Sequence, residues 1–484
     1  MTQTERPALL YFLHINMNEP LWVRPHRRAV YVLLHLLLVV PLGASAQILS
    51  LSDAIRLAAD HYPLLRERGQ QVEAGKAHVQ TINDNRLPAL NLQEQWTLGT
   101  NNAFDGAYFG MGIVPSTTGG VASANSGQVN AGNISTAYLQ WNFYNFGYYS
   151  ALERQARSEL ATDRAALERD RYVLTMQVIS LYLDILKKAR LLTVEADNVG
   201  RNAAIFNAIR ATAAGGLRPG VDSVTAAAAY ADARFSYLGI LDDLSRDKIS
   251  LSVYTGLDTG RIQPDTAAVD RMLSQGDYIN VAADSIPISH PLLDVYQKQY
   301  EAAMAENRSL SREYLPKVGL EAAAWTRSSS IDAAGNYGEL ADGWGYQRQN
   351  YLFGLSVTYN LFDIKKRHDR LKEGDFQARA SQEAIQDERL RLDNTLQQAE
   401  ASYATVLRQL TELQVQRQAA AQAYGQQLAL YQGGLSTLID VTNALYVLRS
   451  SETNYVVRED ELLQILYTKA GLSNQLDVFL QHFK

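Results

Sequence analysis

The sequence contains the same plan twice, and this duplication limits the possible folds more than any other feature. Residues 61–65 (HYPLL) correspond to residues 289–293 (SHPLL), and Leu87-Pro88 follows Pro63 at the same spacing as Leu315-Pro316 follows Pro291. Further on, Trp141 and Tyr359 precede their Gly-Gly-Leu triplets, at 215–217 and 433–435, by equal spacings. The offset between the copies is larger before these aromatic positions than after them. We therefore predict two structural repeats, with the difference in length falling in a loop.

Within each repeat the hydrophobic periodicity changes from helical to alternating. Residues 52–86 have helical spacing, with Ser52 as the expected N-cap, and this helix must end before Pro88. Beyond it, and again in the second repeat, apolar residues occupy every second position, as in a strand. Long Gly/Ser/Asn-rich loops at 99–135 and 327–349 separate the strands of each pair. The four predicted strands comprise residues 88–100, 135–144, 316–326 and 350–362.

Two long proline-free stretches, residues 116–218 and 317–484, permit helices of unusual length. In the second stretch, apolar residues spaced by four and three run from Leu392 to Leu413, which is the spacing of a coiled coil. A helix over residues 147–213 would span roughly 100 Å at about 1.5 Å per residue. The core of an ordinary helical bundle would give similar stripes, so the helices alone do not define the architecture.

Composition excludes several kinds of function. The 484-residue chain has no cysteine, which removes disulfides, thiolate metal sites and cysteine nucleophiles, and its formal net charge of −6 argues against binding nucleic acid through phosphates. We find no HExxH, GxSxG, P-loop or GxGxxG motif, and the eight histidines show no metal-ligand spacing. The sequence predicts no enzyme, no catalytic residue, no cofactor and no metal site.

The first 46 residues are typical of a secretory signal. Three arginines between residues 24 and 28 precede an apolar segment at 29–42, and residues 44–46 (ASA) form a small-x-small cleavage site. The alternative is a transmembrane anchor, but this apolar segment is shorter than the roughly 20 residues needed to span a bilayer. The long stretch before the arginines suggests that translation starts at Met17. No later segment is apolar over a comparable length, so any membrane crossing would use strands.

The predicted strands have one apolar, aromatic-rich face and one polar face, which suits an outer-membrane barrel with lipid outside and water inside. A soluble sheet shows the same alternation. Four strands are too few to close a barrel in lipid, where open edges are not tolerated, so a barrel would have to be shared between chains. Copies around one axis would also align their long helices into a tube. The expected lipid-facing residues are Leu90, Leu92, Trp96, Leu139, Trp141, Phe143, Phe353, Leu355, Val357 and Tyr359.

These features together resemble the TolC-like outer-membrane efflux proteins, also called outer membrane factors. The resemblance rests on residues 49–63 (LSLSDAIRLAADHYP), the Leu-Pro before each first strand, residues 360–363 (NLFD), and Gly434-Leu435 followed by residues 439–441 (IDV). It implies an α+β membrane protein, in which a homotrimer forms a 12-stranded outer-membrane β-barrel continuous with a periplasmic α-helical barrel of coiled coils. It also implies the outer membrane of a Gram-negative bacterium as the location, with a large periplasmic portion.

The resemblance also implies a function. Such proteins are passive exit ducts of tripartite efflux pumps or type I secretion systems, and they bind a periplasmic adaptor (membrane fusion) protein and, through it, an inner-membrane transporter. Outer-membrane lipid is a further expected partner, and nucleic acid is not. We expect a signal peptide at 1–46, a first repeat at 47–256, a linker or equatorial segment at 257–289 and a second repeat at 290–484.

By the same resemblance, the two Gly-Leu turns are helical-hairpin tips that dock the adaptor. Asp440 matches an acidic residue that lines the closed periplasmic entrance, and Asp222 is its counterpart in the first repeat. Asn443 stands where a second acid would complete a double ring, and Ser436 where an arginine would anchor a gate, so closure is expected to depart from the best-known pattern. Plain turns and solvated acids are the alternative interpretations. The docking residues are Gly216, Leu217, Gly434 and Leu435.

The competing hypothesis is an exported, soluble coiled-coil protein that binds or supports other components of the cell envelope. It would need no detergent, because it would lack a lipid-facing surface. A free-standing porin is disfavoured, since it needs at least about eight strands in one chain. We predict the exit duct.

Overall fold

The computed structural model divides the chain into two compact units, Met1–Gln47 and Ile48–Lys484. The described residues are 48–100, 102, 123–215, 219–274, 286–332, 334–481 and 483. The predicted signal peptide and residues 275–285 of the predicted linker lie outside them. The described part is mostly helical with one small antiparallel sheet, and none of its helices is apolar over a sufficient length to cross a membrane.

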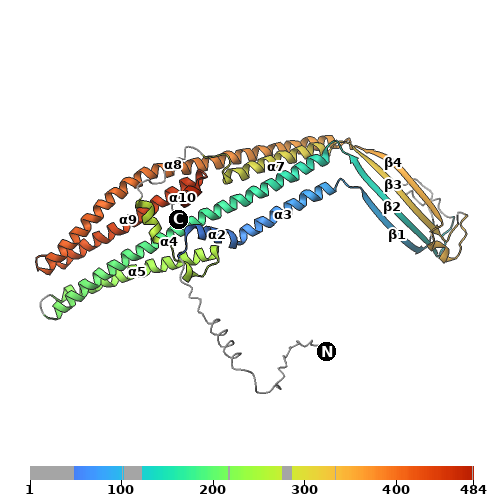
Figure 1. The fold of residues 1–484 in the computed structure, drawn as a ribbon. Coiled ribbons are helices and arrows are strands. Elements are labelled where there is room, and N and C mark those ends of the chain that lie inside the picture. The colour runs from blue at the N-terminus through green and yellow to red at the C-terminus, as the bar shows by residue number, and fades with distance from the viewer. Residues whose placement is uncertain are drawn as a thin grey trace, which may run out of the picture. The chain divides into compact units, whose positions relative to one another are not determined.

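Four strands form a single antiparallel sheet in the order β1-β2-β3-β4 (Figure 1). The two hairpins join through β2 and β3, where Ala137 lies opposite Ala324, and a bulge interrupts this pairing between Trp141 and Tyr144. Within the described chain, β1 and β4 each pair on one side only, so both are edge strands. The strand bounds are β1 (Ala89–Gly99), β2 (Asn130–Tyr144), β3 (Lys317–Ser329) and β4 (Arg348–Thr358).

The predicted strand limits are least accurate at the start of β2 and at the end of β4. β2 begins at Asn130 rather than at residue 135, because the N–H of Ala131 donates to the Ser330 hydroxyl at 2.8 Å and so extends the pairing outward. β4 ends before Tyr359, because Asn360 starts a turn: its side-chain oxygen accepts from the N–H of Phe362 at 3.1 Å. The second loop is also shorter than expected and contains the short 3-10 helix η2 (Leu340–Trp344).

The predicted helix at residues 52–86 is two helices, α2 (Leu51–His61) and α3 (Pro63–Asp84). Tyr62 is extended, with ψ of 124°, because a residue before proline avoids the helical conformation. Ser50, not Ser52, is the N-cap, and its hydroxyl accepts from the N–H of Asp53 at 3.1 Å.

The long helices form two hairpins, α4 (Tyr148–Ala214) with α5 (Gly220–Thr255) and α8 (Asp363–Gln432) with α9 (Leu438–Leu472) (Figure 1). Each strand connects directly to a helix, β1 to α3, β2 to α4, β3 to α7 (Pro291–Glu313) and β4 to α8. Neighbouring helices in the series α3, α4, α7, α8 are in contact, so the helices keep the lateral order of the strands. The shorter elements are η1 (Thr259–Arg261), α6 (Thr266–Ser274) and α10 (Leu476–Gln481).

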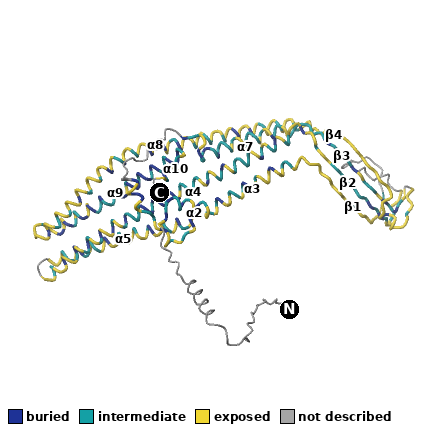
Figure 2. Tube along the Cα trace, in the orientation of Figure 1, coloured by how far each residue is buried: buried dark blue, intermediate teal, exposed yellow. Residues whose placement is uncertain are grey.

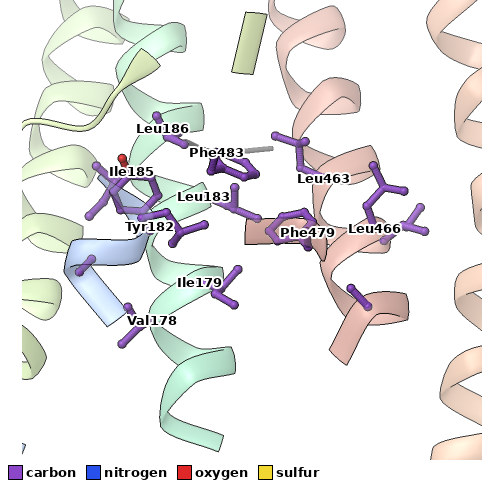
Figure 3. Packing of buried hydrophobic residues seen from close by; sticks show 14 of the residues in the cluster. Val178, Ile179, Tyr182, Leu183, Ile185, Leu186, Leu463, Leu466, Phe479 and Phe483 are labelled. Carbon is purple, nitrogen blue, oxygen red and sulfur yellow. The ribbon is translucent and has the colours of Figure 1, made fainter. Parts of the chain in front are cut away.

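The main core lies among the helices rather than at the sheet (Figure 2). Figure 3 shows Ile179, Leu183 and Leu186 of α4 facing Leu463 and Leu466 of α9, with Phe479 and Phe483 between them. The coiled-coil positions Leu392, Leu396, Ala399, Val406 and Leu410 are buried along α8.

Tyr182 of α4 ties two distant segments into this core. Its hydroxyl donates to the carbonyl of Leu49 at 2.6 Å and accepts from the N–H of Asp265 at 3.2 Å. Burial raises the pKa of Tyr182 to about 12, so the hydroxyl keeps its proton and can donate. Residues near both ends of the first repeat thus meet at one side chain.

Candidate functional site

The turn between α8 and α9 depends on a glycine in the left-handed conformation. Gly434 has φ of 77°, and the N–H of Leu435 donates to the carbonyl of Leu430 at 2.8 Å while that of Gly434 donates to Tyr431 at 3.0 Å. These bonds form a Schellman motif. A Cβ at position 434 would meet no atom, so glycine is required by backbone conformation alone. The motif leaves Leu435 78% exposed at the tip.

Asp440 has a local structural role that sequence reasoning missed. It closes a capping box with Thr437, whose hydroxyl and N–H both donate to its carboxylate, at 2.7 and 3.0 Å. The Thr437 hydroxyl, followed by its N–H, holds the pKa of the Asp440 carboxyl below its usual value. The spacing of Thr437 and Asp440, three residues apart before an apolar run, is the sequence signal that could have predicted this capping box. The capping box is sufficient to explain an aspartate at position 440 in a single chain. A role for Asp440 at the periplasmic entrance is a separate proposal.

Asn443 and Ser436 flank this capped turn. Asn443 is exposed one helical turn after Asp440, on the same side of α9. The Ser436 hydroxyl donates to the carbonyl of Gln427 at 3.4 Å, so it contributes to the turn.

The tip between α4 and α5 begins in the same way but lacks the cap that follows it in the second repeat. The C-cap Gly215 has φ of −82°, close to the −76° of its counterpart Gly433. The predicted docking residues Gly216, which corresponds to Gly434, and Leu217 lie outside the described residues. Asp222 is half-buried at the third position of α5, which corresponds to Asp440 in α9. Pro219 stands where Thr437 stands in the second repeat and offers no side-chain cap, so no capping box forms.

One apolar cluster joins the two tips. It includes residues from α4, α5, α8 and α9, with the loop-proximal residues Tyr431 and Leu438 on either side of the second turn. The two tips of one chain therefore lie at the same end of the long helices, and Asp222 and Asp440 each lie in the first turn of the second helix of a hairpin. The buried members are Ile205, Ile209, Ala226, Tyr431, Leu438, Val441 and Leu445.

Four ion pairs join α4 to α9 between this cluster and the main core, and the sequence analysis did not predict them. Burial raises the pKa values of the Glu459 and Asp460 carboxyls, although Arg190 and Lys187 act in the opposite direction. The partners belong to different repeats, so only the register of the two helices reveals the pairing. The pairs are Lys187–Asp460 at 3.0 Å, Arg190–Glu459 at 2.7 Å, Glu195–Arg449 at 2.9 Å and Arg201–Glu452 at 2.8 Å.

The sheet separates apolar and polar residues onto two faces. Register places Leu90 opposite Leu139, Leu139 opposite Ala322, and Ala322 opposite Phe353, all on one face. The edge strands β1 and β4 are exposed along almost their whole length (Figure 2). On the apolar face, Leu90, Leu92, Trp96, Phe353, Leu355 and Val357 are between 61% and 76% exposed. Trp141, Phe143 and Tyr359 are less exposed, at 38%, 48% and 44%, and Leu139 is half-buried.

One polar row crosses the apolar face. Glu94 lies opposite Ser135, Ser135 opposite Thr326, and Thr326 opposite Gln349. The Ser135 hydroxyl donates to the Glu94 carboxylate. The rows on the helix side of Glu94 are mainly apolar, and Trp96 and Leu98 continue the apolar positions of β1 beyond it, so this polar row interrupts the apolar face. Within the described chain, no group of three His, Asp or Glu residues could hold a metal ion.

An exposed apolar sheet face joined to long helical hairpins is an arrangement shared with known proteins. The sequence profile described as "Outer membrane efflux protein" matches residues 54–257 and 284–468. The chain belongs to the outer membrane efflux protein family. Membership confirms the predicted exit duct of an efflux system in the outer membrane of a Gram-negative bacterium, and it assigns the chain to transport rather than to catalysis. A search of curated proteins found no match.

Solved structures of outer-membrane channels share the fold. VceC of Vibrio cholerae aligns with a TM-score of 0.68 and 17% identity, over 87% of this chain and 96% of its own. The CmeC channel of Campylobacter jejuni aligns with a TM-score of 0.69 and 12% identity, over 88% and 86%. The open state of the Neisseria gonorrhoeae MtrE channel aligns with a TM-score of 0.63 and 14% identity, over 90% of each chain.

Proposed function

We propose that this chain forms, as a homotrimer, the passive outer-membrane exit duct of a tripartite efflux pump or a type I secretion system. It would receive substrate from an inner-membrane transporter through a periplasmic adaptor. The observation that carries the proposal is the four-stranded sheet, which continues strand by strand into long helices and has, within the described residues, two unpaired edges and an exposed apolar face.

Closure of the sheet requires other copies of the chain. Three copies, with β4 of each paired to β1 of the next, would give twelve strands without an open edge. Because α3, α4, α7 and α8 keep the lateral order of the strands, the same rotation would bring α8 of one copy beside α3 of the next. One symmetry operation would thus close both the barrel and the helical tube.

The apolar face would then contact lipid. Its exposed residues include Leu92 and Phe353, whereas the opposite face has Gln93, Glu321 and Asn350, which suit a water-filled interior. The complete proposed lipid-facing set is Leu90, Leu92, Trp96, Leu139, Trp141, Phe143, Phe353, Leu355, Val357 and Tyr359.

The helical tips would serve docking and entry. Leu435 is an exposed apolar side chain on a rigid turn, which supports adaptor docking at Gly434 and Leu435 and, by equivalence, at Gly216 and Leu217. Asp222, Asp440 and Asn443 would surround the periplasmic entrance. A threefold ring of carboxylates at a constriction would favour cations there.

The decisive experiment measures mass and conductance on one sample. Protein extracted from outer-membrane fractions should contain three chains by light scattering corrected for bound detergent, and it should conduct ions in single-channel recordings. A species that stays soluble without detergent and does not conduct would contradict the duct and favour an envelope coiled-coil protein.

Two substitutions separate the charge of Asp440 from its capping role. Asp440→Ala should reduce cation selectivity and widen the resting opening, while Thr437→Ala removes the cap but keeps the carboxylate and should preserve selectivity. Equal cation selectivity in the two variants would show that Asp440 does not line the entrance.

Leu435→Ala tests adaptor docking. It should lower efflux in cells while the trimer and its conductance persist, and Val415→Ala, at another exposed apolar position of the α8–α9 hairpin, is the matched control. Unchanged efflux in Leu435→Ala would argue against docking through this side chain.

A further inference from the structure

A groove lies between α4 and α7 close to the sheet. Its volume is about 520 Å³, and its lining residues come from 151–161 of α4 and 300–308 of α7. Since α4 begins at Tyr148 and α7 ends at Glu313, the whole groove lies within roughly 20 Å of the helix ends that join the strands.

The groove combines an apolar floor with a basic rim. Three arginines face it, against a single carboxylate, that of Glu301. Such a site fits an amphiphile with an anionic head. The floor is formed by Ala151, Ala161, Tyr300, Met304 and Ala305, and the rim by Arg154, Arg157 and Arg308.

Two of these arginines have their charge available. Arg157 is paired with Glu153 at 2.7 Å, and Glu301 is paired with Lys298 at 3.0 Å. Arg154 and Arg308 are exposed and form no ion pair with any residue that the structure describes. The groove therefore has about two uncompensated positive charges.

The groove opens on the side that continues the apolar sheet face. Trp141, which belongs to that face, donates its indole N–H to the carbonyl of Arg86 at 2.8 Å, and the Arg86 guanidinium pairs with Glu153 at 2.5 Å, beside Arg157. On the opposite side of α4, half a helical rotation from Arg157, the ring of Tyr148 contacts Lys317, which belongs to the polar face.

We propose that this groove binds the phosphate headgroup of an anionic phospholipid, whose acyl chains lie along the apolar sheet face. The proposal rests on the lipid-facing role given to that face above. Guanidinium groups match phosphate oxygens in geometry and charge, so Arg154 and Arg308 hold the phosphodiester. The alanines and Met304 contact the glycerol backbone and the first methylenes of the acyl chains.

The test is a titration of the detergent-purified protein with phosphatidylglycerol, followed by native mass spectrometry. Phosphatidylcholine with the same acyl chains is the zwitterionic reference, and glycerophosphate is the soluble source of the same phosphate chemistry. Wild type should bind phosphatidylglycerol on the order of tenfold more tightly than phosphatidylcholine. Arg154→Gln/Arg308→Gln should abolish this preference, and Arg154→Lys/Arg308→Lys should retain most of it.

The matched control removes two exposed charges from another helix, Arg389→Gln/Arg391→Gln on α8, and should keep the preference. Loss in both double variants would indicate a general charge effect and overturn the site, as would a preference that survives in Arg154→Gln/Arg308→Gln. If glycerophosphate competes effectively with phosphatidylglycerol, the groove recognises a soluble phosphate group rather than a lipid, and the proposal is overturned. Trimer mass and conductance of the same samples report separately on the proposed duct, so a trimeric, conducting protein without lipid preference refutes only this site.

Discussion

The two helical hairpins of the chain occupy equivalent places in a duplicated plan, yet their tips are stabilised by different means. At the α8–α9 tip, Gly434 is left-handed and Thr437 forms a capping box with Asp440. At the α4–α5 tip, Gly215 has the conformation of its counterpart Gly433, but Pro219 offers no side-chain cap. Duplication has thus preserved the positions of glycine and aspartate while changing the hydrogen bonds that cap the second helix of each hairpin.

The second helices of the two hairpins differ as well. α5 has seven exposed large apolar side chains, whereas its counterpart α9 has four. Contiguous exposed apolar side chains commonly mark contact surfaces. The first hairpin therefore has more to gain from contacts outside the chain. The exposed apolar residues are Val221, Val224, Phe235, Leu238, Leu241, Ile249 and Val253 of α5 and Ile439, Tyr446, Val447 and Val457 of α9.

The largest expected effect concerns the ion pairs that make the two hairpins one unit. Arg449→Ala leaves the carboxylate of Glu195 buried and unpaired, and should lower the free energy of unfolding by about 3 kcal/mol. Thermal and denaturant unfolding followed by circular dichroism measure this. Arg246→Ala breaks an exposed pair and should cost under about 0.5 kcal/mol. Equal costs would mean that the hairpins are not joined through these pairs.

The second prediction compares a left-handed glycine at one tip with a glycine outside the left-handed region at the other. Gly434→Ala forces an alanine into a left-handed conformation and should destabilise the tip by roughly 1–2 kcal/mol, while Gly215→Ala should be close to neutral. Hydrogen exchange measured by mass spectrometry over the last turns of α8 and α4 detects the difference. If both variants lose the same protection, the left-handed conformation of Gly434 is not what makes this position sensitive to alanine.

A smaller effect is expected at the N-caps. Thr437→Ala removes the capping hydroxyl and should cost about 1 kcal/mol, seen as faster exchange in the first turn of α9. Pro219 has the extended conformation of an N-cap, so Pro219→Thr should let Asp222 form the missing box and slow exchange in the first turn of α5. No slowing in that variant would show that the first tip cannot adopt the arrangement of the second.

The smallest effect is a pH dependence confined to the second tip. The Asp440 pKa is lowered in the folded chain, so its contribution to stability is fully present above the ordinary value of 3.8 and is lost as the pH falls through the folded value. Exchange in the first turn of α9, corrected for intrinsic rates, should increase as the pH falls below about 4. Asp440→Asn should remove this pH dependence. An unchanged pH profile of exchange in that variant would show that Asp440 is not its cause.

Several parts of this architecture follow from sequence because they depend on local rules. The two-residue alternation around Leu90 and Phe353 gives the sheet faces, and the spacing from Leu392 to Leu413 gives the buried stripe of α8. The break at Tyr62 also obeys a local rule, since Pro63 follows it, but continuous helical spacing on both sides concealed it.

Other parts depend on register between segments that are far apart in the chain. The pairing of Glu195 with Arg449 needs the relative position of two helices, and the polar row of Glu94 and Thr326 needs the register of three strands. Asp440 was singled out for its charge, while its bond to Thr437 requires the helix start to be known within one residue.

The concentration of the core among the helices has a consequence for the order of folding. In the single chain the buried strand residues are few, and all of them belong to the central strands β2 and β3. Packing within the chain thus supports the helices, while in the proposed trimer the sheet would gain most of its burial from outside the chain. A newly exported chain should reach a state with formed helices and unfinished strands, and its maturation would end with the capture of the strands by neighbouring copies and bilayer together.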